Sequence, residues 1–148
     1  MGEQHRMRVL ITGVDADGRS CVVGTEEHEL SGNPDHPGFW SAEIARLLAS
    51  PPPRPPGRGS FLEIGLGVGE VGWHVIDYSP SLAYEVHHTD TVDLDLVLEG
   101  SIELTLDDGV HVLQTGDGVV MNGVDHAWRS GPDGCRLNVI QIGTPPPA

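Results

Sequence analysis

The chain has 148 residues, which is enough for one domain with a sizeable core and too few for two domains of ordinary size. Its formal net charge at pH 7 is -14, and its 8 basic residues are all arginines, so the chain contains no lysine. Such an acidic chain repels polyanions, so nucleic acid is not an expected partner, and chemistry through a lysine Schiff base is excluded.

Cysteine use and hydropathy predict a cytoplasmic protein. Cys21 and Cys135 form neither a disulfide framework nor a Cys-x-x-Cys site, so both are interpreted as reduced thiols. No apolar run of signal-peptide length follows residues 1–8, and none approaches the roughly 18 residues that a membrane-spanning helix needs. Export and membrane insertion are therefore not expected.

The first β-prone runs indicate a hairpin. Residues 7–14 and 19–23 flank Asp15-Ala-Asp-Gly18, and an Asp-Gly pair between such runs favours a tight turn. Residues 24–38 are dominated by glycine, proline and charged residues, which predicts a loop.

The next segment has helical spacing. Within residues 39–49, Ile44, Leu47 and Leu48 recur at helical intervals, and Ser41 is suited to the N-cap position. A short helix is predicted, with an irregular edge segment as the alternative.

A proline-rich stretch then divides the chain. Residues 51–59 read Pro-Pro-Pro-Arg-Pro-Pro-Gly-Arg-Gly, which supplies few hydrogen bonds to a sheet and favours extended geometry. A loop is the main interpretation, and a semi-rigid spacer or a ligand for a proline-binding module are the alternatives. Residues 1–60 are therefore predicted to form a hairpin, a loop and a linker packed on the domain that follows.

Residues 61–143 consist of short β-prone runs separated by turns rich in Gly, Asp and Pro. Many short strands with evenly spaced turns describe an all-β sandwich or barrel and not a parallel α/β sheet. Residues 144–148 are expected to form a disordered tail. The predicted strands are 71–78, 84–91, 94–98, 101–106, 110–113, 118–121, 126–129 and 136–142.

Strand alternation selects one set of polar side chains. Residues two apart on a strand share a face, so His87, Thr89, Thr91 and Asp93 project to one side and His88 to the other. If the first side is the barrel interior, an imidazole, two hydroxyls and a carboxylate meet in a cavity. Buried polar groups need partners, which a bound metal, a ligand or the groups themselves can supply.

This stretch and a later one resemble the two motifs of the cupin family. The first cupin motif places a Gly, a His-x-His pair, a Glu and a second Gly at fixed intervals, and the same positions here hold Ser81, His87, Thr89, Asp93 and Gly100. The second motif contains a Gly, a Pro-x-Gly, a His and an Asn, and the corresponding positions hold Gly116, Met121-Asn-Gly123, His126 and Ser130. The resemblance covers residues 61–143 and implies a cupin-type jelly-roll antiparallel β-barrel.

The resemblance also implies a metal site. Cupins commonly hold a metal with both histidines and the glutamate of the first motif and with the histidine of the second. Here His87 and His126 are retained, Asp93 stands in place of the glutamate, and Thr89 replaces the remaining histidine. The set His87, Asp93 and His126 would suit a divalent transition metal such as Zn, Mn, Fe or Ni. The alternative is a metal-free pocket in which these three residues bond to one another.

Other residues are candidates for lining the same pocket. Thr89 and Thr91 share the inward face, and His74 on the predicted strand 71–78 faces either the cavity or the outside. Four large apolar side chains are suited to the pocket walls and equally to core packing, namely Trp73, Tyr78, Met121 and Trp128.

The resemblance implies an enzyme that acts on a small organic substrate. Cupins that resemble this chain include lyases, isomerases, polyketide cyclases and dioxygenases. The reduced ligand set favours lyase, isomerase or cyclase chemistry, either through the metal or with one histidine as general base and Asp93 orienting it. The alternatives are a module that binds a small ligand without turnover and a metal-dependent dioxygenase.

A homodimer is also predicted. Small cupins are typically dimers, and Leu94, Leu96 and Leu98 form a stripe on the strand face opposite Asp93. This apolar face needs cover from another sheet or from another subunit.

Overall fold

A computed structural model describes residues 5–48 and 52–148. That part of the chain forms strands and contains no helix, so it holds no helix that could cross a membrane. The strands are β1 Arg6–Val14, β2 Ser20–Glu29, β3 Ser31–Asn33, β4 His36–Ser41, β5 Ser60–Phe61, β6 Val71–Tyr78, β7 His87–His88, β8 Thr91–Leu106, β9 Gly109–Gln114, β10 Gly118–Asn122 and β11 Ala127–Gly143.

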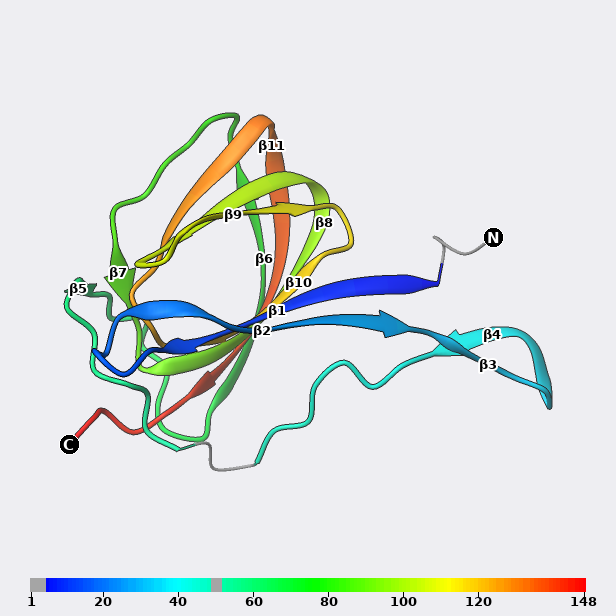
Figure 1. The fold of residues 1–148 in the computed structure, drawn as a ribbon, viewed down its shortest axis with the longest axis horizontal. Helices are drawn as coiled ribbons and strands as arrows, with labels where there is room; N and C mark the ends of the chain where they lie inside the picture. Colours follow the sequence, from blue (N-terminus) through cyan, green and yellow to red (C-terminus); the bar gives the residue numbers. More distant parts are fainter. Residues whose placement is uncertain (1–4, 49–51) are drawn as a thin grey trace.

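One seven-stranded sheet rolls up to form the body of the molecule (Figure 1). Its strand order is β2-β1-β10-β8-β11-β6. The strand β9 lies off this path and pairs in antiparallel register with the C-terminal part of β8, from Ser101 to Leu106. The turn between β8 and β9 joins the start of β2, because Ser20 N donates to Asp107 Oδ2 at 2.8 Å and Asp108 N donates to Ser20 O at 3.2 Å. These bonds close the roll around a common interior, as expected for an all-β barrel of the jelly-roll type.

Strands β8 and β11 are longer than the sequence predicts. Each was expected as two short strands with a turn between them, and each is one long strand that bends. The bend in β8 lies at Gly100, whose φ of 74° is in the left-handed region, and a Cβ there would overlap the carbonyl oxygen of Gly134. The register between the two strands shifts opposite this point, between Ser130 and Cys135. The Glu99-Gly100 pair, which predicts a turn between two strands, therefore marks a bend within one strand at a position that only glycine fits.

The predicted N-terminal hairpin is present and forms part of the sheet. β1 pairs with β2 in antiparallel register. The loop predicted over residues 24–38 is wrong for most of its length, because β2 continues to Glu29 and is followed by β3 and the first part of β4. β1 also pairs with β10 in parallel register, from Val9↔Gly118 to Ile11↔Val120. The sheet is therefore mixed, and this pair departs from the predicted antiparallel pattern.

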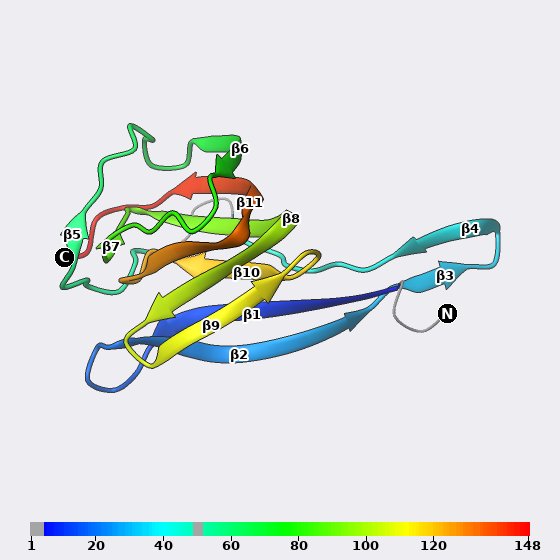
Figure 2. The same cartoon turned by 90° about the horizontal axis from the view of Figure 1, so that it is seen from above.

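The predicted helix over residues 39–49 is wrong over its described part. Phe39 to Ser41 belong to β4, which pairs with β3, and residues 42–48 have no regular secondary structure; Ala49 lies outside the described residues. Trp40 stacks on His5 with ring centroids 4.2 Å apart, which favours the extended hairpin. A helix this short is marginal without a packing partner. The β3–β4 hairpin projects away from the barrel (Figure 2).

The proline-rich segment lies along the barrel as an extended strap, defined here as residues 52–59; Pro51 lies outside the described residues. Arg54 in this strap is buried and pairs with Asp90. Further along, the backbone N–H groups of Arg58 and Gly59 donate to Asp125 at 2.6 and 3.0 Å. The loop interpretation holds, and specific polar contacts fix the strap on the barrel.

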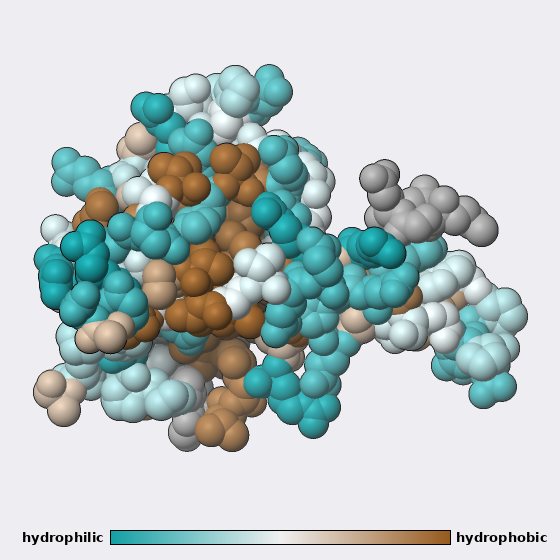
Figure 3. All heavy atoms as spheres, viewed as in Figure 1, coloured by the Kyte–Doolittle hydropathy of each residue, from teal (hydrophilic) through white to brown (hydrophobic). Residues whose placement is uncertain are grey.

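The main hydrophobic core lies inside the roll. Its largest fully buried side chains include Ile102, Leu104, Leu113 and Met121, which come from β8, β9 and β10. On the outer surface shown in Figure 3, apolar side chains gather near the centre of the barrel and hydrophilic ones surround them. The part of the interior that the core leaves open contains the candidate site.

Candidate functional site

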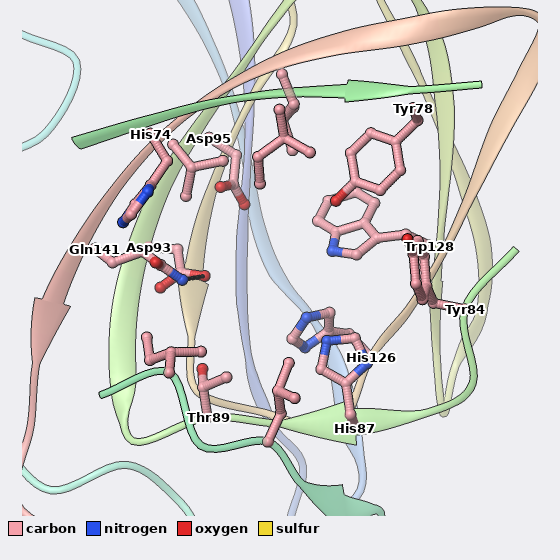
Figure 4. A pocket seen from close by; sticks show the side chains of 15 residues that line it. His74, Tyr78, Tyr84, His87, Thr89, Asp93, Asp95, His126, Trp128 and Gln141 are labelled. Carbon is pink, nitrogen blue, oxygen red and sulfur yellow. Dashed lines mark hydrogen bonds between the residues drawn. The ribbon is translucent and has the colours of Figure 1, made fainter. Parts of the chain in front are cut away.

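A cavity of about 490 Å³ opens inside the barrel (Figure 4). Its walls are mostly apolar, and its polar groups come from β6, β8 and β11 and from the segments that lead into β8 and β11. Such a volume suits a small organic molecule. The lining residues are Leu62, Ile64, His74, Ile76, Tyr78, Tyr84, His87, Thr89, Asp93, Asp95, His126, Trp128, Leu137, Val139 and Gln141.

Two histidines lie side by side in this cavity. His87 and His126 form an antiparallel bridge, in which each backbone N–H donates to the other's carbonyl oxygen at 2.9 Å. Residues paired in this way send their side chains to the same face, and the two rings lie with centroids 4.4 Å apart. The backbone pairing therefore determines the imidazole pair.

The tautomer of both imidazoles follows from their hydrogen bonds. His87 Nδ1 lies 2.8 Å from the carbonyl oxygen of Glu85, and His126 Nδ1 lies 2.8 Å from that of Val124. A carbonyl oxygen only accepts, so each Nδ1 is the protonated donor, and in the neutral ring each Nε2 carries a lone pair. Burial, followed by the charge of His87, lowers the pKa of His126 to about 4, so His126 is neutral near pH 7.

A row of hydroxyl and carboxyl groups occupies another side of the cavity. Thr91 Oγ1 donates to Asp93 Oδ1 at 2.6 Å and bonds to Thr89 Oγ1 at 2.7 Å, and Gln141 Nε2 donates to Asp93 Oδ2 at 3.4 Å. Burial raises the pKa of Asp93 to about 6 despite these bonds. Burial, together with the neighbouring Asp93, also raises the pKa of Asp95 well above its ordinary value. These carboxyl groups therefore retain protons more readily than ordinary aspartates do.

The alternation expected along the first motif is present in the structure. His87, Thr89 and Asp93 line the cavity, and Thr91 is buried beside them as the link between Thr89 and Asp93. His88 faces the other way, where its Nδ1 lies 2.9 Å from Asp125 Oδ1 under the strap.

The predicted wall residues divide into two groups. His74, Tyr78 and Trp128 line the cavity. Trp73 does not, because it alternates with His74 on β6 and is 76% exposed on the outside. Met121 does not line it either, because it lies in the packed core, where the hydroxyl of Thr12 contacts its sulfur at 3.5 Å. For these two residues the prediction of a pocket wall is corrected.

Sequence reasoning missed several lining residues. Asp95 had a usable signal, because it lies two positions after Asp93 on the same strand face. Gln141 lies opposite Asp93 in the β8–β11 register, which required knowledge of the strand pairing. Leu62 and Ile64 come from the segment between β5 and β6 and carry no pattern that assigns them to the cavity.

The predicted metal ligands do not converge as a set. His87 and His126 present two adjacent Nε2 lone pairs, which suit two coordination positions of a Zn, Mn, Fe or Ni ion. Asp93 lies apart from both rings and bonds to Thr91 and Gln141 (Figure 4). Among the residues that the structure describes, no three His, Cys, Asp or Glu side chains are arranged to hold a metal. The three donors therefore do not fit a metal centre in this arrangement.

Comparisons with known proteins give relatives but no matching family model. The phomopsin biosynthesis cluster protein C' of Diaporthe leptostromiformis is 36% identical over 75 residues, which cover 48% of this chain and 40% of that protein. A cupin-domain-containing oxidoreductase of Neurospora crassa is 26% identical over 134 residues, or 83% of this chain and 65% of that protein. The chain thus spans between 40% and 65% of the length of these curated relatives.

A cupin superfamily protein of Desulfitobacterium hafniense aligns in structure with a TM-score of 0.42 and 17% sequence identity, covering 66% of this chain and 98% of that one. The rolled all-β sheet and the cavity in its interior define a barrel of the jelly-roll class. In the positions of its two motifs and in its similarity to the Neurospora relative, the chain resembles a small cupin domain.

Proposed function

We propose that this domain is an enzyme that binds a small organic substrate in the cavity and transfers a proton, as a lyase, isomerase or cyclase does. The observation that carries the proposal is the pair of adjacent Nε2 lone pairs on His87 and His126, in the same cavity as the proton-retaining Asp93. A base and an acid in one largely apolar cavity are what proton transfer at carbon requires.

His87 is the proposed general base. Because the pKa of His126 is lowered to about 4, a proton on His126 is strongly disfavoured near neutral pH. His87 is only half-buried, and its Nδ1–H is held by the carbonyl of Glu85, which leaves its Nε2 free to accept a proton. Neutral His126 beside it is the proposed acceptor of a hydrogen bond from the substrate or from protonated His87.

Asp93 is the proposed general acid. When His87 removes a proton from a substrate carbon, the electron pair of that C–H bond moves toward an adjacent carbonyl oxygen, which takes a proton from the Asp93 carboxyl group. Return of a proton to another carbon gives isomerisation, loss of a leaving group gives elimination, and attack on an internal electrophile gives cyclisation. The raised pKa of Asp93, about 6, suits proton donation near neutral pH.

The name of one relative supports a biosynthetic role. The Diaporthe protein is named for a phomopsin biosynthesis cluster. We propose accordingly that the substrate is an intermediate in the biosynthesis of a small organic compound.

Hydrogen–deuterium exchange tests the proposed chemistry without knowledge of the natural substrate. Three probes share one exchangeable methyl ketone and differ in charge, namely acetophenone, para-(aminomethyl)acetophenone and para-acetylbenzoate. In deuterated buffer, the protein is expected to speed loss of the methyl proton signal of at least one probe by about tenfold or more. His87→Ala is expected to abolish this acceleration, and His36→Ala, a change at an exposed histidine on β4, is expected to retain it. No acceleration by the wild-type protein, or full acceleration by His87→Ala, would overturn the proposal.

A metal-dependent oxidoreductase is the second candidate function. It is favoured by the name of the Neurospora relative and by the two adjacent imidazoles. Metal analysis of protein purified without added ions, and melting temperatures with added Zn, Mn, Fe or Ni, separate the two candidates. A near-stoichiometric metal that raises the melting temperature, and whose removal stops turnover, would favour the second. Proton exchange that survives a chelator would favour the first.

A further inference from the structure

We propose that Asp95 determines substrate specificity by binding a cationic amino group, so that the cavity takes small organic amines with an apolar body. This inference rests on the proposed function only in taking the cavity as the substrate site. The inference adds to the proposed function that the substrate carries a positive charge. It also assigns a role to Asp95, which neither the motif resemblance nor the acid–base proposal uses.

Asp95 is positioned by its strand neighbours. On β8 it lies opposite Val119 of β10 and Val139 of β11, two residues after Asp93, so its side chain faces the cavity (Figure 4). The residue is 6% exposed. Its Oδ2 atom is buried and has no hydrogen-bond partner among the described residues. By contrast, Asp93 is bonded to both Thr91 and Gln141.

The cavity supplies no lysine or arginine for this carboxyl group. The chain contains no lysine, and none of its arginines lines the cavity. A buried carboxyl group that lacks a partner is unfavourable, and a ligand that supplies hydrogen-bond donors removes the penalty. The missing partner of Asp95 is therefore expected to come from the ligand.

The surroundings favour a cation over the other ligand classes. An anionic ligand would face the carboxyl groups of Asp93 and Asp95 with no lysine or arginine in the cavity to offset their charge. A neutral hydroxyl group could bond to Asp95 in either protonation state. An ammonium group would hold Asp95 in its ionised form, and the opposite charges make that hydrogen bond the stronger one. Aromatic rings of Tyr78, Tyr84 and Trp128 line the same cavity, and their faces attract cations. An amine with an apolar body matches both the carboxyl groups and the walls.

The three probes used for proton exchange also test this inference, because they differ mainly in charge. Dissociation constants are measured near neutral pH by titration calorimetry or ligand-observed NMR. The aminomethyl probe is expected to bind at least about tenfold more tightly than acetophenone, and the carboxylate probe more weakly than either. Asp95→Asn is expected to reduce the preference for the amine, taken as the ratio of the two dissociation constants in the same variant, to about twofold or less. Measurable acetophenone binding in the variant reports an intact cavity.

Asp133→Asn is the matched control, because Asp133 is exposed and does not line the cavity. It changes the net charge by the same amount and should retain the wild-type preference. Equal binding of acetophenone and the amine by the wild-type protein, or an undiminished amine preference in Asp95→Asn, would overturn the inference. The exchange assay separates this failure from failure of the proposed function. Exchange of acetophenone that His87→Ala abolishes would leave the proton-transfer proposal standing even if no charge preference existed.

Discussion

His87 and His126 exchange two backbone hydrogen bonds, each 2.9 Å long, and this bridge sets their rings with centroids 4.4 Å apart. The pair is fixed by backbone atoms and by the carbonyl oxygens of Glu85 and Val124, not by contacts between the imidazoles themselves. Replacing one histidine should therefore leave the other in place. This independence makes single substitutions at the pair interpretable.

The first prediction concerns the titration of His126. Its pKa is lowered from 6.5 to about 4, so between these values the unfolded chain binds a proton that the folded protein does not. Stability from this residue is therefore full above about pH 6.5 and is lost as the pH falls toward 4. NMR of the ring nitrogens should find His126 neutral, with the proton on Nδ1, at about pH 5. His126→Asn, whose amide can still donate to the Val124 carbonyl, should resist acid unfolding better than the wild type. An ordinary imidazole titration for His126 would contradict this expectation.

The second prediction concerns Asp93, whose contribution to stability changes with pH in the opposite direction to that of His126. Its pKa is raised from 3.8 to about 6, so the folded protein keeps a proton that the unfolded chain loses. Wild-type stability from this residue is present below about pH 3.8 and is lost as the pH rises through about 6. Asp93→Asn does not titrate, so relative to the wild type it should gain up to about 3 kcal/mol between acidic and mildly alkaline pH. Denaturant unfolding at both pH values measures the gain. The exposed control Asp133→Asn should show no such trend, and a pH-independent difference for Asp93→Asn would contradict the prediction.

The third prediction concerns backbone strain at the start of the first motif. Ser81 has a φ of 55°, in the left-handed region, and the cupin motif has glycine at this position. Ser81→Gly is expected to stabilise the protein by about 0.5–1 kcal/mol, because relief of the strain is partly offset by the freedom that glycine adds to the unfolded chain. Ser81→Ala keeps the Cβ atom and should give no gain. Equal stability of the glycine and alanine variants in denaturant unfolding would refute this explanation.

The fourth prediction tests the strap over residues 52–59. A Cβ at Gly57 would collide with His88 and Asp125, so Gly57→Ala must displace the strap from the barrel. Trypsin is then expected to cleave the Arg58–Gly59 bond several times faster than in the wild type, as followed by mass spectrometry. Gly24→Ala is the control, because its Cβ would lie at an ordinary 3.6 Å from Ile11. Unchanged cleavage in Gly57→Ala would mean that the strap is not held by these contacts.

The fifth prediction concerns self-association. Leu94 and Leu96 lie on the outer face of β8 and line an apolar groove together with Ile44, Val120 and Ile140. A second copy of the chain is the proposed cover for this groove, so light scattering at micromolar concentration should give a dimer mass. Leu96→Arg should yield a monomer, whereas Val110→Arg, at an exposed site on β9, should remain dimeric. A monomeric wild-type mass would reject the dimer.

Local sequence patterns predicted much of the barrel and half of the site. Strand β6 begins and ends at the predicted residues, and the period of two placed His87, Thr89 and Asp93 on one face. These features depend on local backbone geometry, which neighbouring residues in the sequence already fix. The single strand predicted over residues 84–91 is instead the short β7 at His87–His88 followed by the start of β8 at Thr91, and the alternation of side chains persists across the break. The same alternation of side chains along β8 predicts that Asp95, two residues after Asp93, also faces the cavity.

Tertiary structure alone decided the rest, because it depends on contacts between distant segments. The bridge between His87 and His126 and the position of Gln141 opposite Asp93 follow from strand register, which no single stretch encodes. The helix predicted from residue 39 onward shows the same limit. Residues 39–41 belong to β4, which pairs with β3, and residues 42–48, which carry the helical spacing, form no regular secondary structure. The sequence by itself thus determined which side chains of each strand face inward. Only the packed barrel decided which of them meet in the cavity, and that Asp95 lies among them without a partner.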